Sequence, residues 1–126
     1  MIYTSYFAKI KELDLNGLVP IAICGSLPYN YHGVHYMKLA PKWNFFNKWL
    51  ETKDNEYFIK NYNELILSKL KPELVYNDLY NLTGETSNFA MICYETPDKF
   101  CHRHLVSRWL SDHGIPCQEW KSQEEF

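Results

Sequence analysis

Apolar residues gather along the chain in runs of strand length, and three of these runs stand out. They are Ile2 to Phe7, Leu18 to Cys24 and Asn88 to Tyr94, and the last two are almost continuously apolar. Continuous apolarity is typical of strands that are covered on both faces, as in a parallel sheet. A shorter run, Ile115 to Trp120, predicts a fourth strand.

Between these strands the apolar residues recur at helical spacing. A weak helical turn is expected up to Leu13, whereas residues 25–40 contain two glycines and a proline without a clean period and are expected to form a loop. Proline in a first turn and a capping hydroxyl mark several helix starts. The predicted helices begin near Trp43, run from about Asn55 to Leu70, from Pro72 to Leu82, and from Pro97 to just before Gly114.

Strands that alternate with helices predict an α/β fold. We expect a small, mostly parallel sheet of about four strands with helices packed on it, a Rossmann-like arrangement. The 126 residues are enough for one such domain, 1–126, and too few for two separate cores. Right-handed crossovers would place the loops that follow the strands along one edge of the sheet.

Composition narrows the classes of function. With 46% hydrophobic residues the chain can build a core, and its net charge of -2 argues against a protein that binds nucleic acid through a basic surface. No run approaches the length of a membrane span, and the N-terminal residues lack the pattern of a secretory signal. We therefore predict a cytoplasmic protein with no membrane partner. Its four cysteines are expected to be reduced thiols, used by default as small apolar residues. The sequence predicts no cofactor.

Ligands of open parallel sheets bind outside the carboxyl ends of the strands, so residues 94–103 are the first candidate site. A strand end and a helix start meet there, which favours an anion, and Arg103 and Lys99 would add positive charge. The chain has only two arginines against eleven lysines. If the site is catalytic, Cys101 would be the nucleophile, and His102 or Glu95 would transfer protons.

The loop after the second strand is the other half of the candidate site. Gly25 and Ser26 follow that strand directly and would let a phosphate approach the backbone. The rings of Tyr31 and His35 could stack on a planar group such as a nucleobase, although aromatic residues of a long loop more often bury themselves.

Two alternatives stay open at this point. His32, His35, Cys101 and His104 form two pairs with the spacing of metal ligands, and the four would make a zinc site if their loops met. An interaction protein that docks a partner through exposed aromatic residues is the other alternative.

One segment also carries a family resemblance. The sequence ICYETPDKFCHRHLVSRWL, together with IYTSYF and GVHYMKLAPKW, resembles short bacterial and phage-type members of the domain-of-unknown-function 488 family. The resemblance implies a compact α/β fold with its site at Cys101, His102 and Arg103. Many members have Asp-x-Arg after the second strand, where this chain has Cys24-Gly25-Ser26, so no role of that acid and arginine is carried over. The resemblance supplies a location and no reaction. From the residues of the two loops we expect a pocket for a small phosphate- or nucleotide-like anion where residues 25–36 meet residues 94–103.

Overall fold

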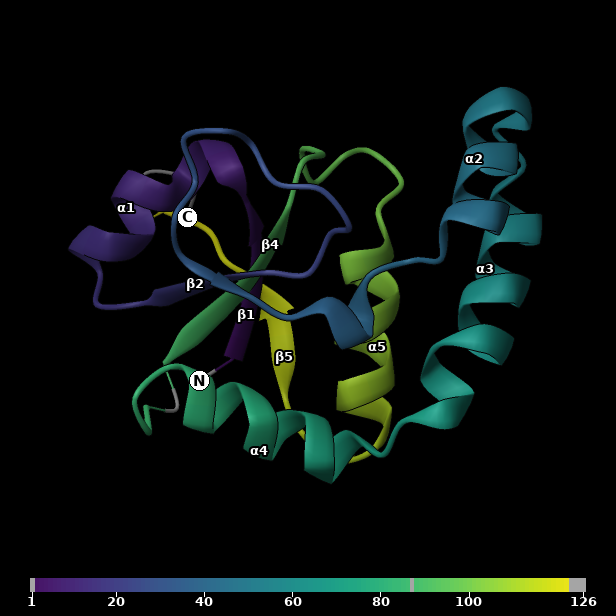
Figure 1. Ribbon diagram of the computed structural model, residues 1–126. Coiled ribbons are helices and arrows are strands. Elements are labelled where there is room, and N and C mark those ends of the chain that lie inside the picture. The colour runs from purple at the N-terminus through teal and green to yellow at the C-terminus, as the bar shows by residue number, and fades with distance from the viewer. Residues whose placement is uncertain (1, 87, 123–126) are drawn as a thin grey trace.

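Five strands form one sheet in which every strand runs parallel to its neighbours. They are β1 (Ile2–Tyr6), β2 (Val19–Ala22), β3 (Val34–His35), β4 (Phe89–Cys93) and β5 (Cys117–Glu119), in the order β3-β2-β4-β1-β5 (Figure 1). This computed structural model describes residues 2–86 and 88–122, so residues 1, 87 and 123–126 of the predicted domain lie outside the described part.

The sheet confirms the predicted α/β class and the four predicted strands. The fifth strand, β3, lies inside the segment that was expected to be a loop. It has two residues and is held by pairing with Ile21 and Ala22 of β2. A strand of two residues cannot show a period of apolar positions, so it had no signal in the sequence.

The helices follow the predicted order. Predicted starts near Trp43, Asn55 and Pro72 agree with the structure, but the helix expected to reach Leu70 ends at Leu65. A short 3₁₀ turn, Leu67–Lys69, continues it, and two more such turns lie at Phe7–Lys9 and Met37–Leu39. The helices are α1 (Ile10–Leu15), α2 (Trp43–Thr52), α3 (Asn55–Leu65), α4 (Pro72–Leu82) and α5 (His102–Asp112).

The predicted start of the last helix at Pro97 is wrong, since α5 begins five residues later, at His102. The Thr96 hydroxyl donates to the Asp98 carboxylate (2.5 Å), and the Lys99 amide donates to the carbonyl of Thr96 (3.1 Å). These bonds close a turn instead of capping a helix. The backbone then extends, and Cys101 becomes the N-cap of α5 with φ of -155°.

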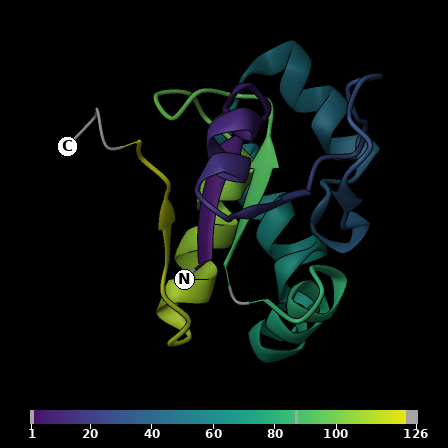
Figure 2. The same cartoon turned by 90° about the vertical axis from the view of Figure 1, so that its left-hand side faces the viewer.

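Each face of the sheet has its own apolar core, because side chains alternate along a strand. On β4, Phe89 and Met91 pack in the larger core with α3, α4 and α5, whereas Ala90 and Ile92 pack in the smaller core with α1. Figure 1 shows α1 on one side of the sheet and α5 on the other, and Figure 2 looks at the molecule from the side of α1.

Helices α2 and α3 form a hairpin, which stands beyond α5 in Figure 1. The turn between them is Lys53-Asp54. Lys53 takes the left-handed backbone conformation (φ 56°), and the Asp54 carboxylate accepts the amide of Tyr57 at 3.2 Å, which caps α3. No helix within residues 2–86 and 88–122 combines the length and the apolarity that crossing a bilayer requires.

Candidate functional site

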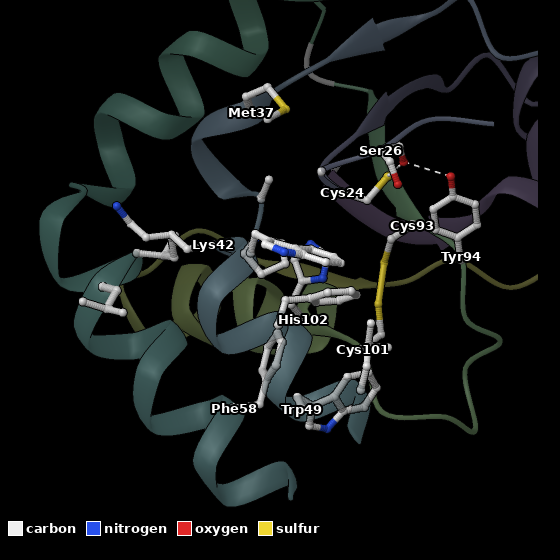
Figure 3. Close-up of a pocket in the computed structure, with 18 of the residues that line it drawn as sticks. Cys24, Ser26, Met37, Lys42, Trp49, Phe58, Cys93, Tyr94, Cys101 and His102 are labelled. Atoms are coloured by element: carbon white, nitrogen blue, oxygen red, sulfur yellow. Dashed lines mark hydrogen bonds between the residues drawn. A yellow bond between two sulfur atoms is a disulfide. The ribbon is translucent and has the colours of Figure 1, made fainter. Parts of the chain in front are cut away.

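A pocket of about 960 Å³ opens between the carboxyl ends of β2 and β4 and the α2–α3 hairpin (Figure 3). Its volume lies at the upper end of the range of ligand pockets, about 300–1,000 Å³. Residues that follow both strands line it, among them Gly25, Ser26, Cys101 and His102. The pocket therefore lies where ligands of open parallel sheets bind.

The structure brings the two candidate loops together through direct contacts. The Tyr94 hydroxyl donates to the carbonyl of Ser26 at 2.9 Å, as the dashed line in Figure 3 shows. The ring of His102 bonds to the carbonyl of Ile23 at 2.8 Å. These two bonds span 68 and 79 residues of the chain, so the shared pocket is a product of the sheet topology.

Cys93 and Cys101 form a disulfide at the wall of this pocket (Figure 3). The expectation that all four cysteines are reduced thiols is therefore wrong for this pair. The two residues are eight positions apart and have no CxxC spacing. Only the return of the chain from the end of β4 to the start of α5 brings them together. Cys24 and Cys117 are free, as expected.

His102 is buried in the first turn of α5, where its surroundings favour the neutral ring. Burial lowers the pKa of His102 to about 4, and the nearby charge of Arg103 acts in the same direction. A carbonyl oxygen can only accept a hydrogen bond, so Nε2 carries the ring proton that is donated to Ile23. Nδ1 therefore keeps its lone pair, and His102 is a neutral base or ligand.

Arg103 is fully buried and does not line the pocket. Its Nε and Nη2 donate to the two carboxylate oxygens of Glu119 at 3.1 and 3.0 Å, and Nη1 donates to the carbonyl of Glu95 at 2.6 Å. A bidentate pair of this kind occupies the guanidinium group whose positive charge was expected to serve a ligand anion. Arg103 thus binds a carboxylate of the protein itself.

The remaining predicted residues divide between the pocket and other surroundings. Glu95 lines the pocket, but Lys99 does not. Tyr31 is buried in the core beneath α1, and its hydroxyl donates to the carbonyl of Val34. The ring of His35 bonds to the carbonyl of Cys24 (2.7 Å) and does not line the pocket. Tyr31 and His35 therefore bind the backbone of their own loop and do not line the pocket.

The structure does not gather the four ligands considered for a zinc site. Within residues 2–86 and 88–122, the only group of three or more metal-ligating atoms is formed by Cys93, Cys101 and His102. Of the four predicted ligands, only Cys101 belongs to this group. Among the others, His35 bonds to a carbonyl and His32 is exposed.

The model of DUF488-N3a, described as the active DUF488-N3 subclade, matches residues 18–114, which is more than half of the chain. The chain belongs to the DUF488 family. The match includes the Cys-His-Arg segment on which the resemblance rested, and the description states no reaction. No curated protein and no solved structure matches the chain.

Sequence reasoning missed the outer wall of the pocket in this DUF488 protein. Aromatic and apolar side chains of the α2–α3 hairpin form this wall, and the helical spacing had shown only that they share one helix face. Lysines also surround the pocket. The sequence showed that lysine is abundant, but it did not predict that several lysines line one pocket. The main missed residues are Phe46, Trp49, Phe58, Lys42, Lys53 and Lys69.

Proposed function

We propose that this DUF488 protein binds a small organic anion that carries a ring or another apolar body, as a nucleoside monophosphate does. The observation that carries the proposal is the pocket itself, which combines apolar walls with an excess of positive charge. Four lysines line it, at positions 38, 42, 53 and 69, and Glu95 is the one acidic residue among the lining residues in the described part of the chain. Such a lining favours an anion with an apolar part over a cation or a purely polar molecule.

The apolar part of the ligand would lie against the hairpin. Phe46 and Trp49 of α2 line the pocket with their rings 5.9 Å apart. The Trp49 indole donates to the side chain of Asn55 at 2.8 Å, which fixes its orientation. A rigid, oriented aromatic surface stabilises a planar ring at little cost in conformational entropy.

The anionic group would lie near lysines whose charge is not already used. Lys38 is paired with Asp78 at 3.4 Å, and Lys53 lies 4.3 Å from the ring centre of Trp49. Lys42 and Lys69 have no ion pair within residues 2–86 and 88–122. On the opposite side, no side chain in the described part of the chain caps the N-terminus of α5, so the positive end of its dipole adds to the field.

Thermal unfolding and fluorescence with three probes test this proposal. We expect adenosine monophosphate to raise the melting temperature and to change the tryptophan fluorescence, with smaller effects of adenosine and of inorganic phosphate. The double substitution Lys42→Ala/Lys69→Ala should weaken binding of adenosine monophosphate by about tenfold, since exposed ion pairs contribute up to about 1 kcal/mol each. Added salt should weaken binding in the same direction.

Lys60→Ala is the matched control, because Lys60 is an exposed lysine of α3 that does not line the pocket. It should bind the probe as the unchanged protein does. The proposal fails if none of the three probes shifts the melting temperature, or if the double variant and the control bind equally well.

A further inference from the structure

The end of β4 and the start of α5 bring three metal-ligating side chains to one place. Sγ of Cys93, Sγ of Cys101 and a ring nitrogen of His102 all lie within 4.8 Å of one another, and all three residues are buried. We propose that these side chains bind one Zn²⁺, or another thiol-binding divalent cation, when the disulfide is reduced. The site does not depend on the organic ligand proposed above, because the metal alone tests it.

The donor set has the chemistry that zinc prefers. Zn²⁺ is a borderline-soft cation that binds both the soft thiolate and the imidazole, and three protein ligands leave a fourth position of a tetrahedral site free. All three side chains line the pocket, so this fourth position faces the pocket and is left to water or to another small molecule.

The surroundings of the three ligands match those of a metal site. The bond from Nε2 of His102 to the carbonyl of Ile23 (2.8 Å) fixes the ring and leaves Nδ1 as the ligand atom. Nη1 of Arg103 lies 3.5 Å from Sγ of Cys93. A guanidinium N–H gains more from a thiolate than from a disulfide sulfur, because the sulfur of a thiolate carries charge.

The backbone holds the two cysteines farther apart than the cysteines of most disulfides. Their Cα atoms lie 7.7 Å apart, whereas disulfides usually join Cα atoms about 4.4–6.8 Å apart. The two cysteines come from different elements, one from the last residue of β4 and the other from the N-cap of α5. Two well-supported elements therefore hold the ligands in place before a metal arrives.

Disulfide and metal exclude each other, and the conversion between them is balanced. A dithiol such as dithiothreitol transfers two electrons and two protons to the Cys93–Cys101 disulfide, which becomes two thiols while the dithiol closes to its own disulfide. Zn²⁺ then replaces the two thiol protons, which are released to the solvent.

Titration with Co²⁺ under argon tests the site in protein that has been reduced and freed of dithiothreitol. We expect one Co²⁺ per chain, with absorption from thiolate-to-Co²⁺ charge transfer and from tetrahedral Co²⁺, and displacement by Zn²⁺. Cys93→Ser and Cys101→Ser should each weaken binding by about 100-fold or more, because loss of an outer-shell partner alone costs about 10- to 100-fold. The oxidised protein should bind no Co²⁺.

Cys24→Ser is the matched control, because Cys24 also lines the pocket but is not part of the ligand group. It should keep the stoichiometry and the absorption. X-ray absorption of the Zn²⁺-loaded protein tests His102 without a substitution and should show two sulfur ligands and at least one nitrogen. The proposal is overturned if the reduced, folded protein binds no Co²⁺, if either serine variant binds as the unchanged protein does, if Cys24→Ser abolishes binding, or if the zinc has no nitrogen ligand.

Discussion

Two cysteines outside the disulfide show how burial sets the chemistry of a single residue. Burial raises the pKa of Cys24 to about 11 and that of Cys117 also to about 11. The thiol of Cys24 donates to the carbonyl of Ser26 at 3.1 Å. Since only the thiolate is a good nucleophile, both residues are inert near neutral pH even though Cys24 lines the pocket.

We expect iodoacetamide to modify Cys24 and Cys117 of the oxidised, native protein at pH 8 roughly 100-fold more slowly than a free cysteine with its pKa near 8.5. The rate should rise about tenfold per pH unit toward pH 10 as the thiolate forms. Mass spectrometry of the labelled peptides measures this, and denatured protein serves as the control in which both residues react. If native Cys24 were labelled at the rate of a free cysteine, its thiol would not be an unreactive, buried group.

At the scale of elements, the α2–α3 hairpin matters most for the site because it forms the outer wall of the pocket. Its position depends on an aromatic cluster centred on Phe58, which is 2% exposed. Five rings lie between 5.2 and 6.4 Å from the ring of Phe58. One of them, Phe100, lies just before α5 and so connects the hairpin to the candidate site.

Phe58→Ala should therefore cost about 3–5 kcal/mol of unfolding free energy, since it removes a buried ring and leaves a cavity. Chemical denaturation measures the loss, and hydrogen exchange should show less protection in α2 and α3 than in β4. Leu74→Ala on α4 is the control, because Leu74 is 57% exposed and its truncation should change stability by no more than about 0.5 kcal/mol. An equal loss of hydrogen-exchange protection in the hairpin and in the sheet would contradict the role of Phe58 in holding the hairpin.

At the scale of the whole molecule, an ion pair between the fully buried Arg103 and the largely buried Glu119 (16% exposed) joins the last helix to the sheet. The bidentate pair of Arg103 and Glu119 connects α5 with β5. Thr4 of β1 donates its hydroxyl to the same carboxylate at 2.6 Å, so three elements meet there. The residue that seemed best suited to bind a ligand anion is thus placed to hold the fold together.

Removing one partner of this pair should destabilise the protein strongly, because the other charge stays buried without a partner. We expect Glu119→Leu or Arg103→Met each to cost about 3–5 kcal/mol, and Arg103→Met/Glu119→Leu to cost much less than the sum of its two single substitutions. Chemical denaturation of the three variants measures the coupling.

The pair of Arg108 and Asp112 provides the comparison, with its charged atoms 4.0 Å apart and its side chains 85% and 66% exposed. Arg108→Ala should change the unfolding free energy by about 0–1 kcal/mol. Additive effects of Arg103→Met and Glu119→Leu would contradict a coupled, buried pair.

Local pattern predicted most of the elements. The apolar runs of β2 and β4 and the proline at the start of α4 act within a few residues, so the sequence alone determined the α/β class, the order of elements and the edge at which the candidate loops lie. The prediction failed where two local signals compete. Thr96 and Pro97 suit a turn as well as a helix start, and the contact of Thr96 with Asp98 decided for the turn.

Only the tertiary structure decided which chemistry-bearing residues share the site. The tertiary structure joins Cys93 to Cys101 in a disulfide, places His102 beside both cysteines and pairs Arg103 with the carboxylate of Glu119. Cys93 lies eight residues from Cys101, and Arg103 lies sixteen residues from Glu119, and no period or spacing along the chain records which of these residues meet. Packing decides these contacts, because each helix buries its apolar face against the sheet or another helix. The resulting position of the helix determines which polar residues lie within reach of one another.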